Sequence, residues 1–177
     1  RAYFPIDIHT NEATYEIQYG NVKRPTHYNT SWDEARFEVC AHKWLDVSED
    51  GYGISVLNDC KYGCDVHNGR IGLTMLKSAT YPNPDADKEH HSFTWSLCPH
   101  SGRWQENQTV AKAYLLNNPY RAVVKQNDGG SLTKTYSAVS VNVSNVVIEV
   151  VKKAEDGEGT IIRMYECWNR RSKATLT

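Results

Sequence analysis

The sequence predicts an all-β protein, an antiparallel sandwich or barrel with few or no helices. Apolar and polar residues alternate along many short segments, turn residues separate these segments, and only two segments resist this pattern. The chain has 177 residues, of which 40% are hydrophobic and 23% charged. This length fits about one domain on the usual scale of roughly 100–200 residues per domain. We expect residues 1–177 to form a single domain that folds without disulfides.

The first strand is predicted over residues 15–19, where three apolar side chains alternate with polar ones until Gly20-Asn21 ends the run. Such alternation is typical of a half-buried antiparallel strand. The next segment is less regular. Ser31 and Glu34 fit a capping box, yet residues 37–41 alternate like a strand. We favour a turn over Ser31–Glu34 followed by that strand.

A tight hairpin is predicted around Asn68-Gly69, because these residues adopt the positive φ angles of a type I′ turn. They separate residues 65–67 from an alternating segment over 71–75. Residues 81–87 should form a loop, since two prolines there fix φ and remove N–H donors. Residues 110–116 fit either a short helix or another strand.

The clearest alternation lies at residues 139–143, which we expect to form a strand. Residues 146–151 and 160–168 should form two more strands, joined by the polar loop 152–159. The final residues, 173–177, resemble a strand cut in the middle. Together with an N-terminal Arg in place of Met, they suggest that the chain is a piece of a longer protein.

Charge and cysteine content exclude several classes of protein. The formal net charge is -1, whereas nucleic-acid-binding domains usually carry a basic excess, and no basic block is present for an anionic membrane. The apolar runs are too short to span a bilayer. The five cysteines form an odd number, which does not fit a disulfide framework. Reduced thiols in the cytoplasm are the simpler interpretation.

Metal and nucleophile motifs are weak. Cys60-x3-Cys64 followed by His67 could form half of a zinc site, but the second pair of ligands is missing. Residues 85–91 hold three acids and two histidines, a composition that also fits a solvated loop. The sequence holds no G-x-S-x-G, H-E-x-x-H or P-loop motif. We therefore assign no catalytic and no metal-binding residue to this chain.

Two loops combine aromatic side chains with fixed polar groups, as sugar-binding sites do. The first, residues 26–33, and the second, residues 57–63, lie between predicted strands, where binding residues often sit. The alternative is that Asp and Asn merely cap backbone groups in elaborate turns. The candidates are Tyr28, Asn29, Trp32 and Asp33 in the first loop and Asn58, Asp59, Lys61 and Tyr62 in the second.

These loops resemble the C-terminal region of α-mannosidases of glycoside hydrolase family 38, most closely the cytosolic type and its bacterial relatives. The resemblance rests on residues 24–33, 35–39, 41–44, 57–63, 91–100 and 133–168. It implies a β-sandwich of the galactose-mutarotase-like supersandwich type. It also implies that loop residues contribute to a mannose pocket, with Lys77 as a further candidate where relatives tend to carry Arg.

The resemblance implies a large multidomain enzyme, of which this chain would be one part. The missing N-terminal catalytic and helical domains would be its partners and would carry the aspartate nucleophile and a divalent metal, zinc or cobalt. The reaction would be retaining hydrolysis of terminal α-D-mannosides, and the fragment alone should be inactive. A free-standing carbohydrate-binding module is the rival interpretation. Removed from its neighbours, such a piece can also expose an apolar patch and form a homo-oligomer.

Overall fold

The computed structural model of the chain describes residues 1–124, 126, 129–131 and 133–177. They form two compact units, Arg1–Asn118 and Pro119–Thr177. No helix in these ranges is long and apolar enough to cross a membrane. That the whole chain forms a single domain remains a prediction.

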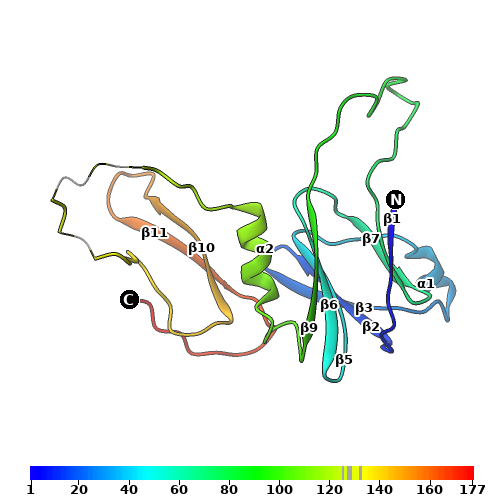
Figure 1. Ribbon diagram of the computed structural model, residues 1–177, viewed down its shortest axis with the longest axis horizontal. Helices are drawn as coiled ribbons and strands as arrows, with labels where there is room; N and C mark the ends of the chain where they lie inside the picture. Colours follow the sequence, from blue (N-terminus) through cyan, green and yellow to red (C-terminus); the bar gives the residue numbers. More distant parts are fainter. Residues whose placement is uncertain (125, 127–128, 132) are drawn as a thin grey trace. The chain divides into compact units, whose positions relative to one another are not determined.

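The first unit contains two antiparallel sheets (Figure 1). In spatial order, the smaller sheet consists of β1 (Ala2–Pro5), β8 (Arg70–Leu73), β7 (Gly63–His67) and β4 (Val39–Cys40). The larger sheet consists of β3 (Gly20–Pro25), β2 (Glu12–Ile17), β5 (Trp44–Glu49), β6 (Tyr52–Asn58) and β9 (Trp95–Ser101). The prediction of an all-β sandwich is confirmed.

A hydrophobic core fills the space between the two sheets. Alternate residues of each strand point into it, because side chains along a strand alternate between the two faces. The larger sheet contributes Ala13, Tyr15, Leu45, Val47, Ile54 and Val56, and the smaller sheet contributes Cys64, Val66, Ile71 and Leu73. In β2 and β8, where alternation predicted a strand, the alternating residues Tyr15, Ile71 and Leu73 belong to the core.

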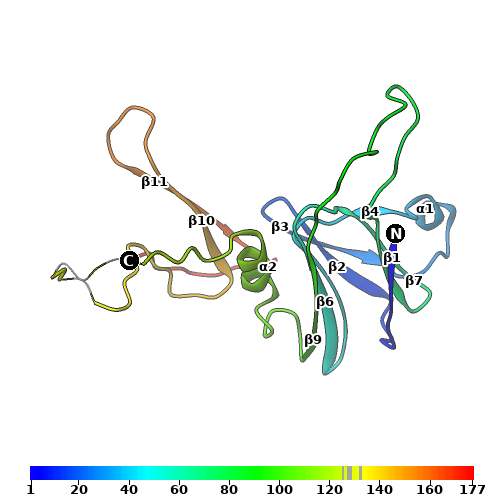
Figure 2. The ribbon, with the colours of Figure 1, turned by 45° about the horizontal axis from the view of Figure 1, so that its top comes forward.

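The opposite face of the larger sheet is polar and is covered by helix α2 (Thr109–Asn117), which Figure 2 shows beside the sheet. Asp46 lies there with its side chain 1% exposed. Its carboxylate accepts hydrogen bonds from Ser48 and from Ser55 Oγ (2.7 Å), and His100 Nε2 lies 2.8 Å away. Ser55 Oγ lies 2.7 Å from Thr109 Oγ1, which joins the helix to this buried network.

Gly53 leaves room for this network. In the sheet it lies between Ser48 and His100, and a Cβ atom added to it would approach His100 Cε1 to 2.6 Å. Trp44 and Trp104 pack against each other beside the network, with ring centroids 4.7 Å apart. A buried polar face of this kind is stable only when its groups bond to one another.

Of two hairpins in the first unit, one was predicted from the sequence and the other was not. Asn68 and Gly69 have φ angles of 52° and 64° and join β7 to β8, which confirms the type I′ turn. Residues 15–17 of the strand predicted over 15–19 belong to β2, which pairs with β3 in a hairpin that the sequence did not predict. The turn of this hairpin lies at Gln18-Tyr19, where Tyr19 takes the positive φ of 56°. The prediction that Gly20-Asn21 ends the run was wrong, since these residues begin β3.

The turn predicted at residues 31–34 is a short helix, α1 (Ser31–Ala35). The predicted strand over residues 37–41 shrinks to β4. The physical reason is the cap: Thr30 and Asp33 form the capping box, one residue earlier than the expected Ser31 and Glu34. Residues 110–116 are also helical, as part of α2.

The second unit contains the predicted hairpin of β10 (Val146–Lys153) and β11 (Thr160–Glu166). The strand predicted over residues 139–143 is absent, and Val141 forms only an isolated bridge with Leu176. Asn142 explains this difference, because its side-chain oxygen accepts the Thr175 N–H at 2.7 Å. Apolar and polar residues do alternate here, but the bond to the Asn142 side chain replaces a backbone hydrogen bond, so no continuous strand forms.

Asp46→Asn should lower the free energy of unfolding by on the order of 2–5 kcal/mol, because the buried network loses its charged acceptor. Chemical denaturation followed by tryptophan fluorescence measures this change. Asp7→Asn is the matched control, since the Asp7 side chain is 98% exposed. Equal stability of the two variants would contradict a role of Asp46 in holding the sheet and α2 together.

Candidate functional site

The first candidate loop ends in helix α1, and two of its predicted residues hold that helix. Asp33 Oδ2 accepts hydrogen bonds from the N–H groups of Asn29 (3.3 Å) and Thr30 (3.1 Å), and from Thr30 Oγ1 (2.9 Å). The pKa of Asp33 is held below its ordinary value mainly by the hydrogen bond from the Thr30 hydroxyl. The two backbone hydrogen bonds lower this pKa further, by smaller amounts. Asp33 therefore acts here as a capping residue, and Asn29 contributes through its backbone.

The aromatic residues of this loop are available at the surface. Tyr28 is 38% exposed, and its ring stacks on His67 with centroids 3.8 Å apart. Partial burial, followed by the nearby charge of Asp65, raises the pKa of the Tyr28 hydroxyl. Trp32, on α1, is 76% exposed. A flat aromatic face of this kind suits a sugar ring or another protein surface.

The second candidate loop joins β6 to β7 and is fixed by Asn58. This residue is buried; its Nδ2 donates to the carbonyl of His42 at 2.6 Å, and its Oδ1 accepts the Lys61 N–H at 2.6 Å. Its own carbonyl accepts a hydrogen bond from Asn117 Nδ2 at 3.1 Å. Asn58 therefore determines the shape of the loop.

Asp59, Lys61 and Tyr62 form the outer part of this loop. Asp59 Oδ2 accepts the Thr94 N–H at 2.9 Å, whereas its Oδ1 is buried without a hydrogen-bond partner in the described part of the chain. Lys61 Nζ lies 4.9 Å from the centroid of the Phe93 ring. Tyr62 is 47% exposed. The loop thus presents an aromatic ring and a cation at the surface.

The two loops lie at opposite ends of β7. Tyr28 contacts His67, the last residue of that strand, whereas Tyr62 directly precedes Gly63, the first. A strand of this length spans roughly 13 Å, at about 3.3 Å per residue. After the first loop, the chain continues through α1 into β4, which pairs with the start of β7. His42, which follows β4, packs edge-on against Tyr62 of the second loop. Tyr28 and Tyr62 therefore lie at opposite ends of this strand, too far apart along it for one sugar ring to contact both.

Lys77, the last predicted residue, is exposed in the segment that follows β8. The structure gives its ammonium group no hydrogen bond or ion pair among the described residues. Among the described residues, Lys77 is therefore not joined to either candidate loop by a hydrogen bond or an ion pair.

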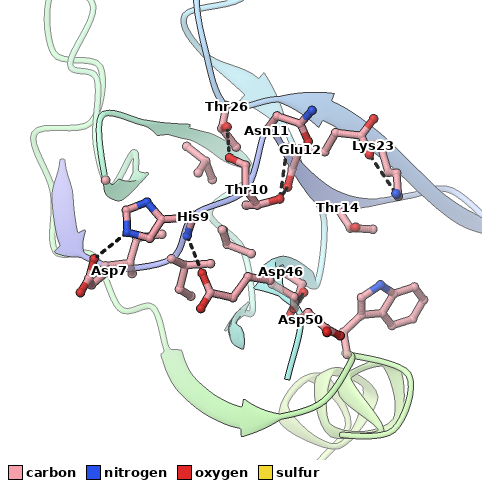
Figure 3. Close-up of a pocket in the computed structure, with 18 of the residues that line it drawn as sticks. Asp7, His9, Thr10, Asn11, Glu12, Thr14, Lys23, Thr26, Asp46 and Asp50 are labelled. Carbon is pink, nitrogen blue, oxygen red and sulfur yellow. Dashed lines mark hydrogen bonds and ion pairs between the residues drawn. The ribbon is translucent and has the colours of Figure 1, made fainter. Parts of the chain in front are cut away.

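Sequence reasoning missed a wide groove with a volume of about 1240 Å³. Figure 3 shows several of its side chains, Asp7, Glu12, Lys23 and Asp46 among them. The lining consists of residues 6–12, 46–50, 66–69 and 103–105, with Thr14, Lys23, Thr26 and His27. These segments are far apart in sequence, so no local pattern could have indicated the groove.

The groove borders the first loop through His67. This residue lines the groove while its ring stacks on Tyr28. Two lining atoms, His27 Nδ1 and Gln105 Oε1, are buried without a hydrogen-bond partner within the described ranges. Buried polar atoms usually have partners, so both atoms could bond to a hydroxyl- or amide-bearing group.

The hypothesis of a zinc site at Cys60, Cys64 and His67 finds no support. In the described ranges, no group of three His, Cys, Asp or Glu side chains is arranged to hold a metal. Cys64 points into the core and burial raises the pKa of its thiol to about 12, whereas Cys60 is exposed. His67 lies three positions after Cys64 on the same strand and therefore faces the opposite side.

The chain matches two family models. Residues 1–85 match the glycosyl hydrolases family 38 C-terminal domain. Residues 145–177 match the glycosyl hydrolases family 38 C-terminal beta sandwich domain. Both models describe C-terminal parts of the same family.

Several curated proteins are similar over nearly the whole chain. Alpha-mannosidase 2C1 of Homo sapiens is 43% identical over 175 residues, which covers 93% of this chain and 17% of that protein. Alpha-mannosidase G of Dictyostelium discoideum is 44% identical over 173 residues, covering 96% and 16%. An alpha-mannosidase of Saccharomyces cerevisiae is 35% identical over 187 residues, covering 98% and 17%. The chain therefore spans only about one sixth of these relatives.

A solved structure has the same fold. The crystal structure of an alpha-mannosidase from Enterococcus faecalis V583 superimposes with a TM-score of 0.85 and 17% sequence identity. The match covers 99% of this chain and 21% of that one. At this identity the likeness concerns the fold alone.

Thr30→Ala should fray α1 and raise the pKa of Asp33 toward its ordinary value, because the hydroxyl bond to the carboxylate is lost. Since the pKa is lowered, the carboxylate stabilises α1 above its ordinary pKa and loses this effect as the pH falls through the lowered value. An NMR titration of the Asp33 side chain measures the shift. Ser31→Ala should change neither property, and a larger effect of Ser31→Ala would contradict the observed cap.

Proposed function

The chain belongs to glycosyl hydrolase family 38, as part of its C-terminal region, and we therefore propose that it is the C-terminal β-region of an α-mannosidase. The observation that carries this proposal is the 35–44% identity to proteins named alpha-mannosidase, over nearly the whole chain. Residues 1–177 would be one β-sandwich region of this larger multidomain glycosidase. The reaction of the whole protein would be retaining hydrolysis of terminal α-D-mannosides.

The bond-breaking groups would lie elsewhere in the polypeptide. Retaining hydrolysis requires two carboxyl groups on either side of the scissile bond, and we assign neither of them to this chain. The zinc or cobalt ion expected for such an enzyme would also be held by the N-terminal domain.

The role of this chain would be to form one wall of the mannose pocket. Tyr62 and Trp32 are the best candidates for contact, since their rings are exposed and the loops beneath them are held by hydrogen bonds. Lys61 and Asp59 could bond to sugar hydroxyls, and we keep Lys77 and Tyr28 as further candidates. Asp33 and Asn58 are better assigned as positioning residues, because backbone groups already occupy their side chains. Asn29 contributes to the same cap through its backbone N–H.

The catalytic and helical domains of the same polypeptide would complete the pocket, and an α-mannoside would be the substrate. We also propose that the protein is cytoplasmic, which agrees with five free cysteines. Association into a homo-oligomer belongs to the same proposal. No described feature favours a free-standing carbohydrate-binding module, which would bind mannose without the rest of the enzyme.

Tyr62→Ala in the full-length enzyme should lower kcat/KM for an α-mannoside by about 10-fold, the effect of losing one aromatic contact in the transition state. Steady-state hydrolysis of an aryl α-mannoside measures this change. Tyr52→Ala is the control, because Tyr52 is 45% exposed but lies at the β5–β6 hairpin. Tyr52→Ala should change kcat/KM less than twofold.

Two outcomes would contradict the proposal. A full-length enzyme without α-mannosidase activity would exclude the reaction. Equal loss of activity in the Tyr62 and Tyr52 variants would exclude a specific role of the second loop. Mannose binding by the 177-residue chain, measured by calorimetry, would instead favour the carbohydrate-binding module.

A further inference from the structure

The connection between β8 and β9 is fastened at both ends to the second candidate loop. At its start, the Thr74 N–H donates to the carbonyl of Gly63 at 2.8 Å. At its end, Thr94 exchanges backbone and side-chain hydrogen bonds with Asp59, at 3.1 and 2.9 Å. Phe93 lies under the ammonium group of Lys61. Both ends of the connection therefore emerge beside the proposed sugar pocket.

Between these ends, residues 76–92 project away from the sheets, as the green segment in both Figure 1 and Figure 2 shows. We call residues 76–92 the arm. Its hydrogen bonds and ion pair are internal, such as Lys88 with Asp85 (3.0 Å) and His91 with the carbonyl of Asp87 (3.0 Å). Within the described ranges, no hydrogen bond or ion pair joins the arm to the rest of the chain.

The length of the arm exceeds what the connection needs. Thr74 and Thr94 both bond to the same short loop, so a few residues would suffice to join them. Connections longer than about 12–15 residues without secondary structure are uncommon in compact domains and are usually functional or disordered. Ordering such a segment costs conformational entropy that contacts must offset.

The arm carries residues suited to such contacts. Tyr81 is 87% exposed and Leu76 is 42% exposed. Pro82 and Pro84 follow Tyr81 and restrict the backbone, which reduces the entropy lost on docking. Aromatic side chains on a restricted backbone are typical anchors of protein interfaces. Folded back as a hairpin, the arm could reach about 25 Å from its base, at about 3.3 Å per residue.

We propose that the arm docks on the part of the same polypeptide that carries the catalytic groups, and so closes the mannose pocket beside Asn58–Tyr62. This inference rests on the proposed function. The chain spans only 16–17% of its curated relatives, which leaves ample polypeptide for the arm to contact. The catalytic part is the favoured partner because both ends of the arm are fixed at the loop that would face it.

The test uses the full-length enzyme with residues 77–91 replaced by Gly-Ser-Gly. The KM for an aryl α-mannoside should rise by about 10-fold or more, because substrate escapes from a pocket that no longer closes. The single substitution Tyr81→Ala should raise KM by about threefold, as the loss of one interface anchor. The control replaces residues 154–158, the exposed turn between β10 and β11, and should leave KM unchanged.

Unchanged KM in both arm variants would overturn the inference. A lower oligomeric mass on light scattering, with unchanged KM, would also overturn it, since the arm would then dock on a second copy. If the shortened enzyme fails to fold, the KM of the Tyr81→Ala variant alone tests the inference. Failure of the proposed function is distinguishable, because it would leave the unmodified enzyme inactive on α-mannosides.

Discussion

The carboxylate of Asp46 lies beneath helix α2, on the face of the larger sheet that points away from the hydrophobic core. Ser48, Ser55 and His100 converge on it from three strands. Because the group is almost completely removed from water, it must be satisfied by these neighbours. The network therefore fixes the register of β5, β6 and β9 as well as the position of the helix.

Helix α2 connects the Asp46 network to the second candidate loop through hydrogen bonds at its two ends. Its first residue, Thr109, contacts Ser55 in the middle of β6. Its last residue, Asn117, donates to the carbonyl of Asn58, where β6 ends and the second loop begins. The helix thus holds one strand at two points. The Asn58–Tyr62 loop is consequently supported by buried hydrogen bonds, which keeps its exposed groups in fixed positions for binding.

Much of the fold could be predicted from the sequence, because local chemistry decides it. Asn68-Gly69 fixes a turn by its backbone preference, and the alternation predicted in β2 and β8 includes the core residues Tyr15, Ile71 and Leu73. The errors occurred where a single side chain decides the outcome. Thr30, and not the expected Ser31, is the N-cap residue of helix α1. The side chain of Asn142 bonds to the Thr175 N–H and so interrupts the strand that alternation predicts over residues 139–143. The groove could not be predicted, since its lining comes from distant segments.

The candidate residues divided into two groups that the sequence could not separate. The side chains of Asn58 and Asp33 accept hydrogen bonds from backbone N–H groups, whereas the rings of Trp32 and Tyr62 are exposed at the surface. Photoaffinity labelling of the full-length enzyme with a diazirine-bearing α-mannoside would test the central claim most directly. Labelling within residues 58–62 is the predicted result. Labelling confined to residues outside this chain would contradict the claim that it forms a wall of the mannose pocket.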